Sequence, residues 1–311
     1  MSRWKRGLAI CLAITIGAFA ASEIWIERTA RVILAGLNWS AGLERKSVTT
    51  SFGEVAYLEG GEGQTVVFLH GIFALKEHWI DMSRQVSGNY RVVLLDLPGF
   101  GENQRLEPQA YDYARQAENV IETLDRIGVA EFHVAANSMG AQIAGLLATS
   151  IPDRVQSVAF IGGPVGVTSP RPSDMETAIA AGQLPLVVTT TADYDARMEW
   201  LFPAEPFIPR PVARYWAQNE VSQAESNREI WAAVMASDGP RLEELAYDID
   251  QPSLVIWCAE DRIFDVSGAV VLAEALGNAT LHELSGCGHL PMLDSPDDTG
   301  RMLLEFLNRQ S

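Results

Sequence analysis

The stretch of residues 132–141, FHVAANSMGA, constrains the fold of this chain more than any other. Its first half is apolar and predicts a buried strand, and Asn137-Ser138-Met139-Gly140 predicts a sharp turn into a helix. A serine at such a corner is lifted clear of the sheet, and small residues beside it, Ala136 and Gly140, let the strained turn close. The pattern is typical of a nucleophile elbow in which alanine replaces the first glycine. An ordinary strand and helix joined by a turn that contains a serine is the alternative interpretation.

Strands and helices alternate on both sides of this corner. Two short strands are predicted within 47–59, and longer, mostly apolar strands at 65–70, 91–97, 155–163, 252–260 and 279–286. Amphipathic helical patterns lie between them, and a last helix is predicted from 296 to 308. This alternation predicts an α/β fold with a mostly parallel, eight-stranded sheet and helices on both faces.

The alternation stops between residues 164 and 248, where proline-punctuated helical patterns carry large apolar side chains. We expect this segment to be an inserted helical cap (lid), with residues 47–163 and 249–311 forming the core. So much apolar surface predicts a hydrophobic groove over the serine. The candidate substrate-binding residues are Trp200, Phe202, Phe207 and Ile208. Simple packing of these side chains onto the edge of the sheet is the alternative.

Two further polar residues follow predicted strands. Asp261 comes directly after strand 252–260, and His289 follows strand 279–286. Parallel strands end at the same rim of a sheet, so both residues should lie beside Ser138, and the chain order Ser, Asp, His is a known order for a catalytic triad. Glu260 and Asp265 compete for the acid position. We favour Asp261 because the turn residue directly after a strand points over the rim.

The chemistry that these residues predict is nucleophilic attack by serine. A serine hydroxyl is a poor nucleophile at neutral pH, so it needs a base and a third group that orients the base. His289 and Asp261 would supply these. The backbone amide of Met139, with that of Ile72 or Phe73, could stabilise the resulting oxyanion. We expect His70, at the start of the same loop, to stabilise the loop by hydrogen bonding rather than to transfer protons.

Charge and cysteine content exclude several other functions. The formal net charge of −17 and the absence of clustered Lys and Arg argue against a nucleic-acid partner. The three cysteines, Cys11, Cys258 and Cys287, form no CxxC pair, so we expect free thiols rather than a disulfide framework or a zinc site.

The amino-terminal segment predicts membrane targeting. Residues 1–26 carry basic residues at the start followed by an apolar run, as in a membrane anchor or a signal segment. The basic residues precede the apolar run, so the domain is expected on the exported, periplasmic side. We favour a retained anchor; cleavage near Ala20 and secretion is the alternative. Residues 27–46 are expected to form an amphipathic linker helix at the membrane surface, or else a helix packed on the domain.

With these residues in place, the sequence resembles the α/β-hydrolase superfamily over about residues 47–309. The resemblance rests on five motifs, HGIF (70–73), DLPGFG (96–101), NSMGA (137–141), AEDRIF (259–264) and GCGHLPML (286–293). The leader and the cap segment 193–218 are similar to those of cold-active bacterial lipases and membrane-anchored monoacylglycerol lipases. The resemblance implies a serine ester hydrolase, a carboxylesterase or lipase, that forms an acyl-enzyme from apolar acyl esters of glycerol or simple alcohols, without metal or organic cofactor. The sequence departs from the family at the elbow, where Ala136 and Ala141 replace glycines.

Other functions occur within the same fold. Carbon–carbon bond hydrolases share an Asn-Ser-Met-Gly elbow but carry an aromatic residue after the histidine, where this chain has Leu290. Dehalogenases and epoxide hydrolases use an aspartate nucleophile, which Ser138 excludes. A cofactor-free perhydrolase stays open. A non-catalytic ligand-binding member would usually have a broken triad, and here all three residue types are present. The sequence leaves acyl length and oligomeric state open.

Overall fold

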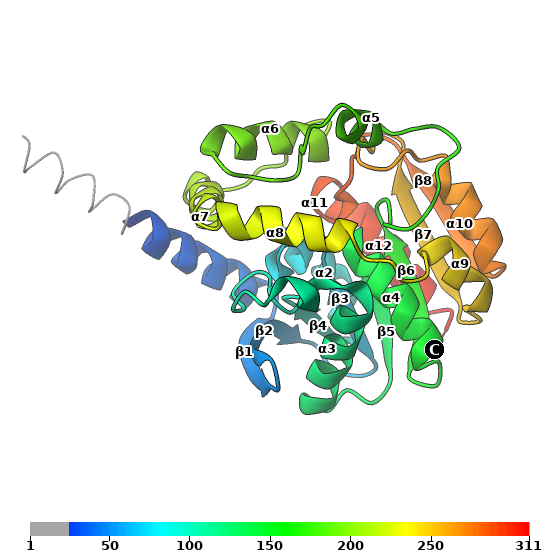
Figure 1. The fold of residues 1–311 in the computed structure, drawn as a ribbon. Coiled ribbons are helices and arrows are strands. Elements are labelled where there is room, and N and C mark those ends of the chain that lie inside the picture. The colour runs from blue at the N-terminus through cyan, green and yellow to red at the C-terminus, as the bar shows by residue number, and fades with distance from the viewer. Residues whose placement is uncertain (1–24, 311) are drawn as a thin grey trace, which may run out of the picture.

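The structure, a computed structural model, describes residues 25–310. Its elements are arranged around a single eight-stranded sheet (Figure 1). The strand order is β1-β2-β4-β3-β5-β6-β7-β8. The strands are β1 (Leu43–Thr50), β2 (Gly53–Gly60), β3 (Thr65–Leu69), β4 (Arg91–Leu95), β5 (Phe132–Ala136), β6 (Val155–Ile161), β7 (Ser253–Cys258) and β8 (Ala279–Leu284). β1 and β2 run antiparallel to their neighbours and all other pairs are parallel. The predicted mostly parallel sheet is confirmed.

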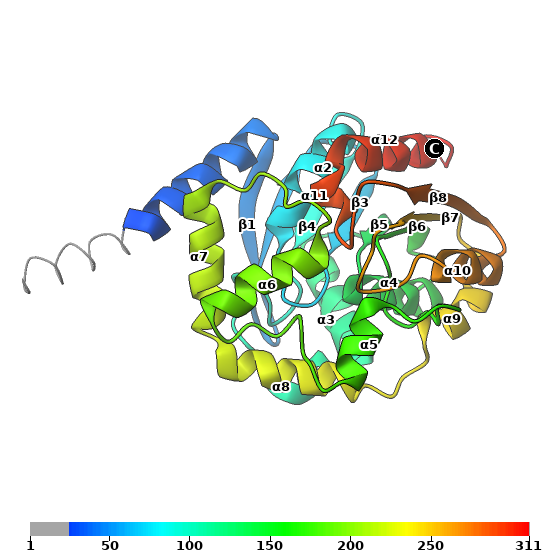
Figure 2. The ribbon, with the colours of Figure 1, turned by 90° about the horizontal axis from the view of Figure 1, so that it is seen from above.

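Helices cover both faces of this sheet (Figure 2). One face carries α3 (Tyr113–Arg126), α4 (Met139–Ser150) and α10 (Gly268–Leu276), and the other carries α2 (Ile80–Val86) and α12 (Pro296–Leu307). Neighbouring side chains of β3 illustrate why the strand is apolar throughout. Val67 and Leu69 pack into the first layer, whereas Val66 and Phe68 pack into the second. A strand buried on both faces has no polar side to show in its sequence.

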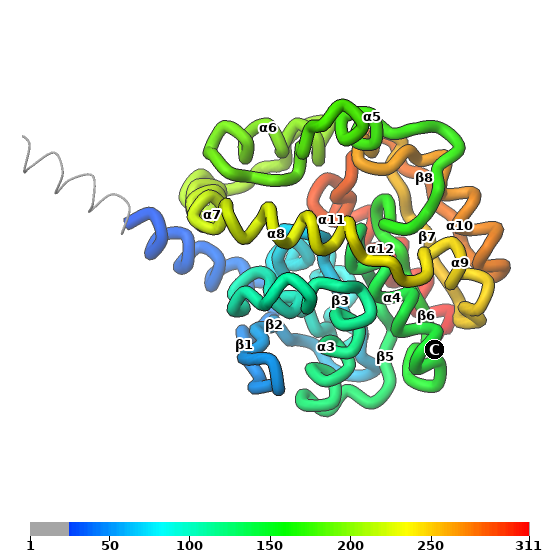
Figure 3. Tube along the Cα trace, in the orientation of Figure 1, coloured from blue at the N-terminus to red at the C-terminus, as the bar shows by residue number. Residues whose placement is uncertain are grey.

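Four helices between β6 and β7 form a layer over the carboxyl ends of the strands, which can be followed in Figure 3. They are α5 (Asp174–Ala180), α6 (Thr191–Leu201), α7 (Arg210–Val221) and α8 (Ala224–Met235). Capping boxes at Ser173 and Thr190 begin α5 and α6, because each side chain accepts a hydrogen bond from an otherwise unpaired amide. The short helix α9 (Leu242–Leu245), near the end of the same insertion, packs against α4 of the core.

The predicted linker helix of residues 27–46 is shorter than expected at its carboxyl end. The helix spans residues 25–40, and residues 43–46 belong to β1, where they pair with β2. Gly42 adopts a φ of 69°, a left-handed conformation that ends helices and favours glycine. The guanidinium of Arg31 lies 5.5 Å from the ring centroid of Tyr215, so the helix contacts α7. Its exposed side chains include Trp25, Val32 and Trp39.

The predicted anchor of residues 1–26 lies, except for its last two residues, outside the part of the chain that the structure describes. Among residues 25–310, no helix combines the length and the apolar character that crossing a membrane requires.

Cys258 and Cys287 are joined by a disulfide, with their Cα atoms 5.4 Å apart. The expectation of free thiols was therefore wrong for this pair, while Cys11 lies outside the described residues. The two cysteines stand 29 positions apart in the sequence, but β7 and β8 are neighbours in the sheet, and this brings the end of β7 close to the loop that follows β8. Sequence spacing alone does not reveal such a pairing.

Candidate active site

Ser138 occupies the strained corner between β5 and α4. Its φ of 54° and ψ of −116° are unusual for a residue with a side chain, and such a conformation costs about 1–3 kcal/mol. Gly140 permits the turn, because a Cβ atom there would lie 2.5 Å from the carbonyl oxygen of Leu69. Ala136 is fully buried in β5 and pairs with Leu69 and Phe160, so this position accommodates a methyl group. The predicted elbow geometry is therefore present with alanine at its first small position.

The structure places Asp261 against His289. Oδ2 of Asp261 lies 3.0 Å from Nδ1 of His289, and Oδ1 accepts hydrogen bonds from the amides of Ile263 at 2.8 Å and Phe264 at 3.1 Å. The two competing acids are engaged elsewhere. Glu260 accepts a hydrogen bond from the amide of Gly286. Asp265 pairs with Arg171 and accepts a hydrogen bond from the amide of Ser267.

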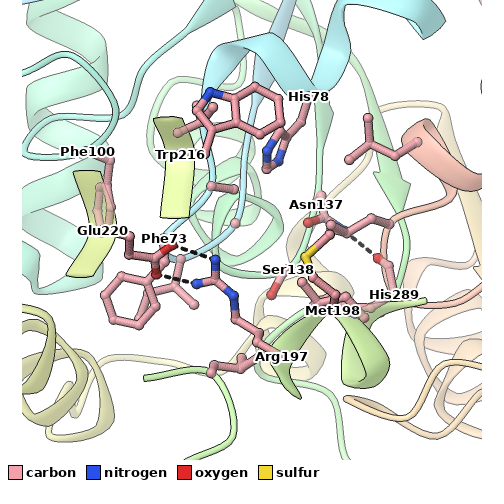
Figure 4. Close-up of a pocket in the computed structure, with 18 of the residues that line it drawn as sticks. Phe73, His78, Phe100, Asn137, Ser138, Arg197, Met198, Trp216, Glu220 and His289 are labelled. Atoms are coloured by element: carbon pink, nitrogen blue, oxygen red, sulfur yellow. Dashed lines mark hydrogen bonds and ion pairs between the residues drawn. The ribbon is translucent and has the colours of Figure 1, made fainter. Parts of the chain in front are cut away.

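Ser138 and His289 line the same cavity, and both are nearly buried (Figure 4). Asn137 fastens the histidine loop to the elbow. Its Nδ2 donates hydrogen bonds to the carbonyl oxygens of His289, at 3.1 Å, and Ile161, at 2.8 Å. One side chain next to the serine thus links the elbow, the end of β6 and the loop that carries His289.

The loop that follows β3 lines the same cavity as Ser138. Phe73 has a φ of 55°, and the amide of Ala74 closes the turn on the carbonyl of Gly71 at 3.3 Å. Within residues 25–310, the amides of Ile72, Phe73 and Met139 donate no hydrogen bond to a protein acceptor. The predicted oxyanion donors are therefore unused by the fold.

His70 holds this loop, as the sequence predicts. Its Nδ1 donates to the carbonyl of Gly71 at 2.7 Å, and its Nε2 accepts a hydrogen bond from the amide of Leu97 at 2.9 Å. Burial lowers the pKa of His70 to about 4, because the charged form loses its hydration. The ring is neutral at physiological pH and keeps both bonds.

A buried charge cluster lies behind the same loop. Nζ of Lys76, fully buried, contacts Asp96 at 2.7 Å and both Glu77 and Glu102 at 2.9 Å. Asp96 also accepts a hydrogen bond from the amide of Glu102, which fixes the Pro/Gly turn that follows β4. The carboxylates raise the pKa of Lys76 against the effect of its burial, so the amine stays charged.

The cavity over Ser138 is mainly apolar but has a polar side. The apolar lining comes from the loop after β3, the cap and the histidine loop: Ile72, Leu75, Leu186, Met198, Leu201, Phe202, Ile208, Trp216, Leu290 and Leu293. The polar lining includes His78, Arg105, Arg197 and Glu220. Figure 4 shows the guanidinium of Arg197 paired with the carboxylate of Glu220 through two hydrogen bonds. No sequence pattern points to these polar residues, because they lie on separate elements and form no motif.

Only two of the four predicted substrate-binding residues line this cavity. Phe202 and Ile208 do so, the former almost fully buried. Phe207 does not, because it lies in the loop between α6 and α7 with 93% of its surface exposed. The prediction that Phe207 lines the substrate groove was therefore wrong. Trp200 is also absent from the lining; the guanidinium of Arg262 lies 4.5 Å from its ring centroid.

Comparisons with known proteins identify the family to which this chain belongs. A family model described as the alpha/beta hydrolase fold matches residues 64–296. Lipase 1 of Psychrobacter immobilis is 26% identical over 286 residues, covering 90% of this chain and 89% of its own. Monoacylglycerol lipase ABHD6 of Homo sapiens is 24% identical over 311 residues, covering 95% of this chain and 92% of its own.

A crystal structure of a membrane phospholipase A, described as a bacterial virulence factor, superimposes with a TM-score of 0.88 and 34% identity. The match covers 100% of this chain and 99% of that one. The family match spans most of the sequence, and the resemblance inferred from the motifs is confirmed. The chain belongs to the α/β hydrolase fold family and is a lipase-like member of it.

Proposed function

We propose that the protein is a serine hydrolase of carboxylic esters, with Ser138 as nucleophile, His289 as general base and acid, and Asp261 as the residue that orients His289. The observation that carries the proposal is the 3.0 Å contact between Asp261 and His289 at the cavity that also contains the strained Ser138. A serine held at a positive φ in the same cavity as an oriented histidine has no evident structural purpose.

In the proposed mechanism, Oγ of Ser138 attacks the ester carbonyl while Nε2 of His289 accepts its proton. The carbonyl oxygen becomes an oxyanion that accepts hydrogen bonds from the amide of Met139 and that of Ile72 or Phe73. Losing one such donor typically costs about 3 kcal/mol of barrier. His289 then protonates the leaving alcohol. Water, deprotonated by the same histidine, hydrolyses the acyl-enzyme and regenerates the serine.

The proposed substrate is an ester with an apolar acyl chain. The apolar lining formed by Met198, Phe202, Ile208 and Leu293 supports this, because burial of methylene groups against such side chains is favourable. Relatives named monoacylglycerol lipase and lipase point to glycerol esters.

Phospholipase A activity is the second candidate. The specific observation in its favour is the 34% identity to a membrane phospholipase A over the whole chain. The guanidinium of Arg105 at the polar side of the cavity is compatible with a phosphate-bearing alcohol, while that of Arg197 already pairs with Glu220. Carbon–carbon cleavage has no comparable support, and Leu290 stands where we expect an aromatic residue in those enzymes.

We further propose that the protein is attached to the membrane through its amino terminus, with the domain on the exported side. The apolar exposed side chains of Trp25, Val32 and Trp39 support contact with a membrane surface. The disulfide between Cys258 and Cys287 supports an oxidising compartment.

Covalent labelling tests the proposed chemistry. A fluorophosphonate probe should label the purified protein at Ser138, and Ser138→Ala should remove both labelling and ester turnover. Turnover of p-nitrophenyl esters, a monoacylglycerol, a diacyl phospholipid and a vinylogous diketone should then be compared. Labelling that persists in Ser138→Ala excludes this serine as nucleophile, and cleavage of the diketone alone excludes an ester hydrolase.

A further inference from the structure

The acid and the base of the proposed triad are supported unequally by the sheet. Asp261 follows β7, which pairs on both sides, with β6 and with β8. Its carboxylate also accepts hydrogen bonds from three backbone amides, those of Gly163, Ile263 and Phe264. The acid is therefore fixed by its own strand and by its own turn.

The strand that precedes His289 has fewer neighbours than the strand that precedes Asp261. The loop of His289 follows β8, which is the last strand of the sheet and pairs on one side only. The side chains of β8 are half-buried or exposed, whereas those of β7 are all buried. Beyond β8, the amide of His289 donates to the carbonyl of Leu201 in the cap at 2.9 Å, so part of its support comes from an inserted segment rather than from the sheet.

The disulfide joins β7, which precedes Asp261, to the loop that carries His289. Cys258 is the last residue of β7, three positions before Asp261, and Cys287 stands two positions before His289. Both cysteines are almost fully buried. We propose that Cys258 and Cys287 are positioning residues of the catalytic site: their disulfide fastens the loop of the base to the strand of the acid, and so maintains the contact between His289 and Asp261.

This inference rests on the proposed function, because positioning has a kinetic meaning only if His289 and Asp261 act together. The bond forms when the two thiols exchange with an oxidised protein disulfide. The two cysteines lose two electrons and two protons, and the partner disulfide is reduced to two thiols. A small displacement of a catalytic group costs roughly 10- to 100-fold in rate. We therefore expect loss of the bond to reduce the rate of chemistry while leaving substrate binding intact.

The test uses the full-length protein in detergent, with Cys11→Ser in every sample so that only one cysteine pair remains. The variant is Cys258→Ala with Cys287→Ala. The matched control is Leu272→Ala, which removes a fully buried side chain from α10 and destabilises the core away from the cavity lining. All samples are assayed at a temperature at which circular dichroism shows them folded.

For the double cysteine variant we expect kcat and the rate of fluorophosphonate labelling of Ser138 to fall together, by roughly 10- to 100-fold, with KM nearly unchanged. Leu272→Ala should lower the melting temperature but keep kcat. If the double variant is folded and retains the kcat of the parent, the disulfide contributes stability alone and the inference is wrong. Failure of the proposed function gives a different result, since the parent itself would then show neither labelling nor turnover.

Discussion

At the scale of single residues, Phe202 and Phe207 lie five positions apart in opposite environments. Phe202 is 5% exposed and lines the cavity, whereas Phe207 is 93% exposed. Each methylene group of an acyl chain buried in the cavity contributes about 0.8 kcal/mol, so removing one large side chain there should change chain-length preference by roughly 10- to 100-fold. We expect Phe202→Ala to shift the ratio of long-chain to acetyl ester turnover by such a factor.

Phe207→Ala is the matched control for this measurement, because it removes the same side chain from the surface of the same segment. Its turnover ratio should equal that of the parent. Equal ratios for all three proteins would mean that Phe202 contributes only to packing, and that chain length is selected elsewhere.

Buried histidines give the protein a pH-dependent stability. Burial lowers the pKa values of His70 and His133 to about 4 and that of His78 to about 3, below the ordinary value of 6.5. The unfolded chain therefore takes up protons first as the pH falls below 6.5. Each group contributes stability that is present above pH 6.5 and is lost as the pH approaches its pKa in the folded protein. A shift from 6.5 to about 4 corresponds to roughly 3 kcal/mol.

His133→Gln offers a test away from the cavity, since His133 contacts Ser157 at 2.8 Å within the sheet. The free energy of unfolding in urea should fall between pH 7 and pH 4.5 in the parent and fall less steeply in the variant. Identical slopes would show that His133 does not titrate as proposed.

The candidate site residues that the sequence locates best are those whose place in the structure follows from their position relative to a strand. Ser138 and Asp261 follow the buried strands β5 and β7, and His289 follows β8, whose side chains are half-buried or exposed. The three strands are parallel, so their carboxyl ends place these residues at one rim. Phe207 was misassigned because apolar character does not specify orientation within a loop. Arg197 and Glu220 escaped prediction because their pairing depends on how two cap helices pack.

At the scale of elements, an ion pair between Arg197 and Glu220 joins α6 to α7 where these two cap helices line the cavity. Their side chains are only 8% and 11% exposed. Breaking a buried ion pair by removing one partner leaves an uncompensated charge and typically costs about 3–5 kcal/mol, whereas replacing both partners by apolar residues is often neutral. We expect Glu220→Leu to destabilise the protein by such an amount, and Glu220→Leu with Arg197→Met to recover most of it.

Urea denaturation of the parent, both single variants and the double variant measures the coupling energy between the two positions. Independent, additive effects of the two substitutions would show that the pair does not tie the helices together.

Local chemistry determines several of the observed element boundaries. The capping boxes at Ser173 and Thr190 begin cap helices, and Pro152 follows closely after α4 ends. The helix of residues 25–40 ends earlier than predicted because pairing with β2 takes over residues 43–46, and this long-range competition is not visible in an amphipathic pattern.

At the scale of the whole molecule, the proposed membrane attachment is separable from catalysis. Every residue that lines the cavity comes after residue 70 in the chain. Removal of residues 1–24 should therefore move the protein from the membrane fraction towards the soluble fraction and leave the turnover of water-soluble esters nearly unchanged. Fractionation of cells followed by an acetyl ester assay on both fractions measures the two effects. A full-length protein recovered entirely from the cytosol would contradict the export proposed here.

The covalent link between β7 and the loop of His289 affects when the protein becomes active. A newly made chain spends its first moments in a reducing compartment, where Cys258 and Cys287 remain thiols. An enzyme that cleaves lipid esters is hazardous to the cell that synthesises it. If the full catalytic rate requires the disulfide, the reduced enzyme hydrolyses the lipids of the cell that makes it only slowly. It gains its full rate after the two cysteines are oxidised. The same two cysteines would then act as a safeguard during biogenesis, one that needs no inhibitor, no propeptide and no second protein at the active site.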